Sequence, residues 1–172
     1  SNINQTFIEH RTLLHICTEY DRYDMVYYLI TSLHADIECV DKYGYTPLLI
    51  AASKSMKIIQ YLISLHANIY IIDKLNRTIC HHACTSINGL NIMKYLIEEI
   101  HINILENIDN DGHTCLSIAV MNNNIELVRY LIDTIHMNKY ITLKDGSTLL
   151  HIASQYNNIE LNNAQFLDAI IR

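Results

Sequence analysis

The chain has 172 residues, of which 50% are hydrophobic, and a formal net charge of −6 at pH 7. This length and composition allow one domain with a sizeable core and exclude a disordered tail. The acidic balance, with only 12 scattered Lys and Arg residues, argues against a nucleic-acid-binding surface. No apolar run reaches the roughly 18 to 20 residues of a membrane span, and the five cysteines lack paired spacing, which favours reduced thiols in a cytoplasmic or nuclear protein.

Two short phrases recur along the chain. The first, T-L-L-H-I-C at residues 12–17, returns in altered form at 46–51, 78–83, 114–119 and 148–153. The second, Y-L-I, occurs at residues 28–30, 61–63, 95–97 and 130–132, with steps of 33 (61−28), 34 (95−61) and 35 (130−95) residues. Self-similarity at this period indicates a repeat architecture of five units.

Each unit predicts a turn, a short helix, a second turn and a longer helix. The Thr that opens the first phrase is a typical N-cap residue, and Pro47 follows one such Thr at the first helical position, where its missing N–H is not needed. Gly44, Asn76 and Gly112 stand just before the Thr, where a turn requires a left-handed residue. One unit buries too little apolar surface alone, so the units must stack.

These phrases resemble the T-P-L-H-x-A signature of the ankyrin repeat family over residues 7–161. The resemblance implies an all-α solenoid of stacked helix-turn-helix units with short β-turn fingers, forming one domain over residues 1–172. We place the repeats at approximately 7–40, 41–72, 73–108, 109–141 and 142–172. Only Pro47 keeps the signature Pro, and only His15, His81 and His151 keep its His. The second helix of the last unit departs most, because residues 162–165 replace the expected apolar pattern.

The stretch T-I-C-H-H-A-C at residues 78–84 suggests a zinc site, because two cysteines bracket two histidines. In the repeat register, however, Cys80, His81 and Cys84 occupy ordinary scaffold positions, where Cys acts as a small hydrophobe. His82 is the surplus residue, since its counterparts are Ile16, Ile50, Ile118 and Ile152. A buried imidazole needs a hydrogen-bonding partner. We therefore favour a scaffold role and predict no metal and no cofactor; the alternative is a metal- or redox-regulated scaffold that uses Cys80, His82 and Cys84.

Two further series repeat with the units. The histidines near the end of each second helix, His34, His66, His101 and His136, are predicted to end the helix in a left-handed conformation. The alternative is a pH-sensitive stripe of imidazoles. The tyrosines of the Y-L-I phrase are predicted to pack between helices rather than to stack on bases or a cofactor.

The resemblance also implies a concave surface, formed by turn tips and first helices, that holds another protein. Tyr and Arg are enriched at binding hot spots, and these residue types gather in units two and three, so we expect the partner there. The predicted partner-binding residues are Tyr20, Lys42, Tyr43, Tyr45, Lys54, Lys74, Leu75, Arg77 and His113. Because several are cationic, we expect an acidic peptide or domain. The alternative is that these tips are solvated and bind nothing.

No glycine-rich phosphate loop and no set of mutually placed catalytic residues is found in the sequence, so we predict no catalytic residues. The predicted function is a monomeric, non-catalytic protein-interaction module that neither binds nucleic acid nor inserts into membranes. One alternative is a regulatory or substrate-recruiting ankyrin domain of a larger enzyme, ubiquitin-ligase adaptor or channel; another is a structural spacer. The chain lacks an initial Met and polar end units, so we expect it to be part of a longer protein, with further repeats or another domain beside it.

Overall fold

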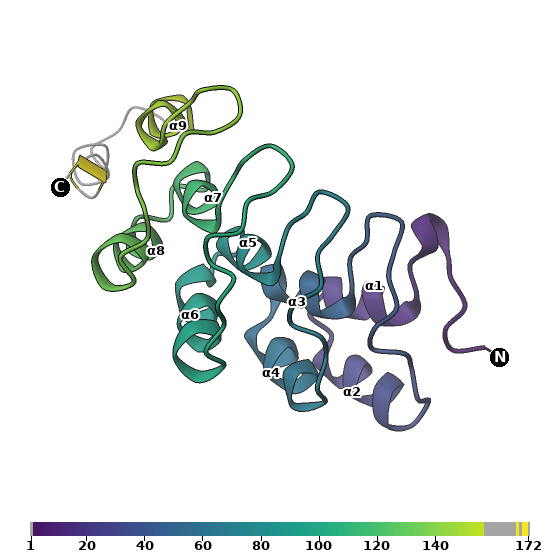
Figure 1. Ribbon diagram of the computed structural model, residues 1–172. Helices are drawn as coiled ribbons and strands as arrows, with labels where there is room; N and C mark the ends of the chain where they lie inside the picture. The colour runs from purple at the N-terminus through teal and green to yellow at the C-terminus, as the bar shows by residue number, and fades with distance from the viewer. Residues whose placement is uncertain (1, 157–167, 169, 172) are drawn as a thin grey trace.

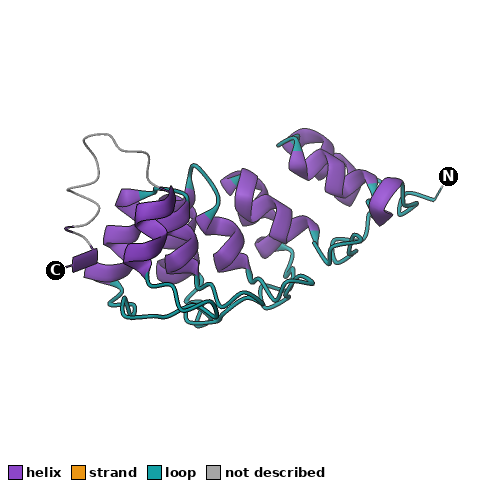
Figure 2. Ribbon diagram, turned by 90° about the horizontal axis from the view of Figure 1, so that it is seen from above, coloured by secondary structure: helices purple, strands orange, loops and turns teal. Residues whose placement is uncertain are grey.

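A computed structural model describes residues 2–156, 168, 170 and 171. Within these residues the chain forms pairs of helices that follow one another in a single row, with long loops projecting from one side of the row (Figure 1). Seen from above, the helices again lie side by side, and loops connect them along one edge (Figure 2). The predicted all-α solenoid is confirmed, and none of the described helices is long and apolar enough to cross a membrane.

Units one to four each contain a first helix and a second helix. Unit one contains η1 (Ile8–His10), α1 (Leu13–Glu19) and α2 (Tyr23–Thr31), and unit two contains α3 (Pro47–Lys54) and α4 (Met56–Ser64). Unit three contains α5 (Ile79–Cys84), α6 (Gly89–Lys94) and η2 (Tyr95–Glu99), and unit four contains α7 (Cys115–Met121), α8 (Ile125–Arg129) and η3 (Tyr130–Thr134). Unit five begins with α9 (Leu149–Tyr156). The unusual second helix of unit five, expected from Ile159, lies outside the described residues.

The first helices begin where the sequence predicts. The hydroxyl oxygen of Thr46 accepts the N–H of Leu49 at 3.3 Å, and that of Thr114 accepts the N–H of Ser117 at the same distance. Each of these bonds satisfies one of the backbone donors that a helix start leaves without a partner. The N-caps at Thr46 and Thr114 are thereby confirmed.

The second helices end at the predicted histidines, which adopt left-handed φ values of 54°, 63°, 57° and 59° at His34, His66, His101 and His136. In unit two the turn closes because Ala67 N–H donates to the Leu62 carbonyl at 3.1 Å. Units one, three and four carry one more residue than unit two between the tyrosine of Y-L-I and this His. In units three and four the π-helical turns η2 and η3 accommodate it, which the sequence analysis did not predict.

The core runs continuously through the units, between the first and second helices. Tyr61 packs against Tyr23 and Tyr27, with ring centroids 5.8 and 5.5 Å away. The Tyr130 hydroxyl donates to Glu98 at 2.8 Å, so packing also accounts for this tyrosine. Tyr28, the first of the series, is instead exposed.

Candidate partner-binding surface

We call the loop before each first helix a finger. The five fingers comprise residues 7–11, 41–45, 73–77, 109–113 and 143–147, and in each the first N–H donates to the fifth carbonyl at 2.8 to 3.0 Å. The finger at 7–11 has the sequence Phe-Ile-Glu-His-Arg, with Phe7 at the position where fingers two to four carry Asp.

Aspartates fix the conformation of fingers two to four. In finger two, one carboxylate oxygen of Asp41 accepts the N–H groups of Tyr43 and Tyr45 at 2.8 and 2.9 Å. Asp73 and Asp109 do the same in fingers three and four. These backbone bonds hold the finger side chains in place before any ligand arrives.

Neighbouring fingers are also joined through their backbones. The N–H groups of Lys42, Lys74 and Asn110 donate to carbonyl oxygens of the preceding finger at 2.7, 2.9 and 2.9 Å. Fingers one to four therefore form one continuous, hydrogen-bonded row, which can be followed in Figure 1 as the adjacent loops before α1, α3, α5 and α7.

The signature histidines anchor this row to the helices. His15 Nδ1 accepts the Thr12 N–H at 3.1 Å, so its Nε2 carries the proton and donates to the Tyr45 carbonyl at 2.9 Å. His81 repeats this bridge to the His113 carbonyl at 3.0 Å. Burial lowers the pKa of both imidazoles. Each histidine thus ties its own helix to the next finger in neutral form.

A hollow of about 380 Å³ opens between fingers one to three and the first helices of units one to three. We call it the first hollow. Tyr43 and Tyr45 stand in its wall with ring centroids 6.0 Å apart, and Ile50 and His82 belong to its lining. The remaining lining residues are Glu9, Arg11, Glu19, Asp41, Ser53, Lys54, Arg77 and Thr85.

The charges of the first hollow are mixed. Glu19 pairs with Arg11 at 2.7 Å, and Arg77 Nε donates to the buried Asp109 at 3.1 Å. Glu9 accepts from the Tyr43 hydroxyl at 2.5 Å and lies 3.7 Å from Lys42 Nζ. The lining therefore includes carboxylates beside the lysines and arginine that suggested a basic patch. Lys54 is the lining cation with no ion pair among the described residues.

His82 has the partner that the sequence analysis required. Its Nε2 lies 3.0 Å from Asp73 Oδ2, and the Tyr45 ring meets the imidazole edge-on at 5.0 Å. Burial would raise the pKa of Asp73, but the hydrogen bonds from His82 and from the Arg77 and Leu75 N–H groups lower it overall. His82 therefore connects α5, finger three and a wall residue of the first hollow.

The predicted site residues are only partly brought together. Tyr43, Tyr45, Lys54 and Arg77 line the first hollow. Lys42 lies beside it, with its ammonium 5.2 Å from the centre of the Tyr43 ring. The other predicted residues do not line it: Tyr20, Lys74, Leu75 and His113.

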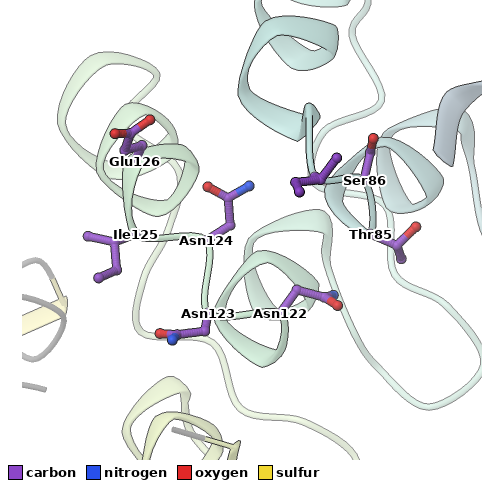
Figure 3. A pocket seen from close by; sticks show the side chains of 8 residues that line it. Thr85, Ser86, Asn122, Asn123, Asn124, Ile125 and Glu126 are labelled. Carbon is purple, nitrogen blue, oxygen red and sulfur yellow. The ribbon is translucent and has the colours of Figure 1, made fainter. Parts of the chain in front are cut away.

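Two other hollows differ in character. His113 lines one of about 320 Å³ between fingers four and five, together with Lys144 and Tyr156. Figure 3 shows the other, about 460 Å³, where the turn at 85–87 of unit three faces the turn at 122–126 of unit four. Its hydroxyl and amide side chains are largely engaged locally; for example, Asn124 caps α8 by accepting the Leu127 N–H at 3.1 Å.

The cysteines of the T-I-C-H-H-A-C stretch are scaffold residues. Cys80 and Cys84 are fully buried, and none of the chain's cysteines forms a disulfide. Cys84 contacts Cys115 of α7, and together with burial this contact raises the pKa of the Cys115 thiol. Across the described part of the chain, no group of three or more His, Cys, Asp or Glu residues is placed to hold a metal ion.

Comparison with known proteins identifies the family. A family model described as ankyrin repeats (3 copies) matches residues 14–106 and 81–167. A curated relative, transient receptor potential cation channel subfamily A member 1 of Homo sapiens, is 33% identical over 121 residues, which are 68% of this chain. The match spans 11% of that relative's length. The chain therefore belongs to the ankyrin repeat family.

Proposed function

We propose that this chain is a monomeric, intracellular, non-catalytic module that binds a segment of a partner protein in the first hollow. The ankyrin repeat is a general protein-interaction module. The observation that carries the proposal is the combination of two exposed side chains, Tyr43 and Lys54, in a hollow whose fingers are already fixed by hydrogen bonds; Lys54 forms no ion pair with any described residue. Such preorganisation lowers the entropy lost on binding.

The lining indicates which segment would fit. Lys54 has no carboxylate partner among the described residues, and Arg77 engages Asp109 through Nε alone. The two outer nitrogens of Arg77 therefore stay available, and a carboxylate matches their geometry. The neighbouring Tyr43 and Tyr45 rings offer an apolar surface. We expect an acidic residue close to an aromatic or aliphatic residue in the bound segment.

A peptide-display selection tests this proposal. The immobilised chain is offered a library of random peptides, and a Tyr43→Ala, Lys54→Ala variant is screened in parallel. Both positions are exposed, so the variant should keep its circular-dichroism spectrum. We expect peptides with adjacent acidic and apolar residues to be enriched on the wild type and lost on the variant.

A Lys144→Ala, Tyr156→Ala variant is the matched control, because it removes the same residue types from the hollow between fingers four and five. It should retain the enriched peptides. Enrichment of the same peptides on all three proteins would place binding elsewhere and contradict the proposal.

The comparisons favour a second candidate, a regulatory or recruiting ankyrin domain within a larger enzyme, adaptor or channel. The match covers 11% of a much longer channel subunit. An immunoblot of source cells with an antibody to this chain tests it. A band far above 19.9 kDa would support the larger protein, whereas a single band at that mass would contradict it.

A further inference from the structure

The outward face of unit one differs from the same face in the units that follow. Met25 stands three residues before the tyrosine of Y-L-I, and its counterparts are Ile58, Ile92 and Leu127. Met25 is 45% exposed, whereas all three counterparts are 0% exposed. Tyr28 is 50% exposed, whereas Tyr130, at the same position in unit four, is 9% exposed. Apolar side chains that are core elsewhere are thus on the surface here.

The preceding unit covers this face in unit two. Helix α2 packs against α4, and the rings of Tyr23 and Tyr27 contact Tyr61. The established interface between units one and two therefore shows what kind of surface fits over these positions: an outer helix with paired aromatic residues.

The finger row is also open at this end. The N–H groups of Lys42, Lys74 and Asn110 each donate to the finger before them. Ile8 holds the same place in finger one, and its N–H forms no hydrogen bond within the described residues. Phe7 beside it is 55% exposed, whereas Asp41, Asp73 and Asp109 at that position are buried.

Residues 2–6 do not close this face. Ile3 packs on the core and Asn4 accepts the Asp36 N–H at 2.9 Å, yet Met25 and Tyr28 keep about half of their surface in solvent. Contiguous exposed apolar side chains of this kind mark an interface.

We propose that the outward face of unit one receives a further ankyrin unit of the same polypeptide, packed in the register that unit one uses on unit two. The added unit supplies aromatic residues over Met25 and Tyr28 and a backbone carbonyl to the Ile8 N–H. This inference is independent of the proposed function, but it lengthens the finger row beyond Glu9 and so extends the surface available to a partner.

The test uses a second copy of residues 7–40 inserted directly before Phe7, which keeps the repeat spacing. We expect the Ile8 amide to exchange its hydrogen at least about tenfold more slowly in the extended chain. Met25→Gln should shift the urea midpoint of unfolding little in the original chain, where Met25 is exposed, but strongly in the extended chain, where it is covered. Ile58→Gln should shift the midpoint strongly in both chains, because Ile58 is buried in both.

A copy carrying Tyr23→Ser and Tyr27→Ser is the matched control, because it lacks the covering aromatic residues. It should leave Ile8 exchange close to that of the original chain. The proposal is overturned if the Ile8 amide exchanges its hydrogen at the same rate in the original chain and in the intact extended chain. It is also overturned if the inserted copy adds no helical circular-dichroism signal. In either case the face does not support a stacked unit.

Discussion

Finger three and finger five have the same length but not the same support. In finger three, Asp73 accepts the N–H groups of Leu75 and Arg77 and a hydrogen bond from His82. In finger five, Leu143 replaces that Asp, and the exposed Asp145 accepts a single N–H, from Ser147, at 2.9 Å.

The signature histidines differ in the same way. His81 is buried and bridges to finger four, whereas His151 is exposed and, among the described residues, its imidazole bonds only to Thr148 of its own helix start. Finger five is linked to finger four through the Lys144 side chain, which donates to the Asn110 carbonyl at 2.5 Å. A repeated sequence phrase therefore does not guarantee a repeated set of interactions, and the fingers fixed by an aspartate are those of units two to four.

The largest expected effect comes from the two histidines. His81→Ala should lower the free energy of unfolding by about 3 kcal/mol, because it opens a cavity and leaves buried backbone groups without partners. His151→Ala should lower it by less than about 1 kcal/mol, because its neighbours are solvated. Urea unfolding followed by circular dichroism measures both. Equal losses would mean that the buried bridge does not stabilise the stack.

A pair of glycines gives a smaller difference. Gly44 and Gly146 both have left-handed φ values, +83° and +85°, so Gly→Ala should cost about 1 kcal/mol at either position. A Cβ at Gly44 would also lie 3.0 Å from Lys74 N, whereas one at Gly146 would meet nothing within 4 Å. We expect Gly44→Ala to destabilise by about 1 kcal/mol more, again from urea unfolding. If the two variants lose equal amounts of unfolding free energy, the contact with the Lys74 backbone does not restrict a side chain at position 44.

The smallest effect concerns pH. The pKa of Asp73 is lowered in the folded chain, so its interactions stabilise the fold above the unfolded pKa, about 3.9, and this contribution is lost as pH falls through the folded pKa. His82→Ile removes the side-chain hydrogen bond that lowers this pKa. The variant should be about 1 kcal/mol less stable at pH 7 and should lose less stability between pH 5 and pH 3. If the urea midpoints of the wild type and the variant change with pH in parallel, the coupling between His82 and Asp73 is contradicted.

Local patterns predicted most of the fold. The N-caps at Thr46 and Thr114 and the left-handed histidines depend on residues close together in sequence, and they are present in the structure. The need of His82 for a partner followed from a single substitution in the register. Asp73 could not be named as that partner, because its position depends on how finger three folds back over α5.

The site was less predictable for the same reason. Glu9 was missed because finger one carries Phe7 where the others carry Asp or Leu. The lysines and Arg77 predicted a basic patch, because the sequence does not show which carboxylates the stack brings beside them. One such carboxylate is Asp109 of the next unit, which pairs with Arg77. The net charge of a patch on a repeat surface depends on side chains about one unit away in sequence, and composition alone does not reveal which of these lie side by side.

The most direct test of the binding surface is a quantitative pull-down from source-cell lysate with three forms of the chain: wild type, Tyr43→Ala with Lys54→Ala, and Lys144→Ala with Tyr156→Ala. Circular dichroism establishes that all three are folded. We predict that one or more partners bind the wild type and the Lys144, Tyr156 variant equally and are lost from the Tyr43, Lys54 variant. Partners retained equally by all three forms, or lost only with Lys144 and Tyr156, would contradict a site in the first hollow.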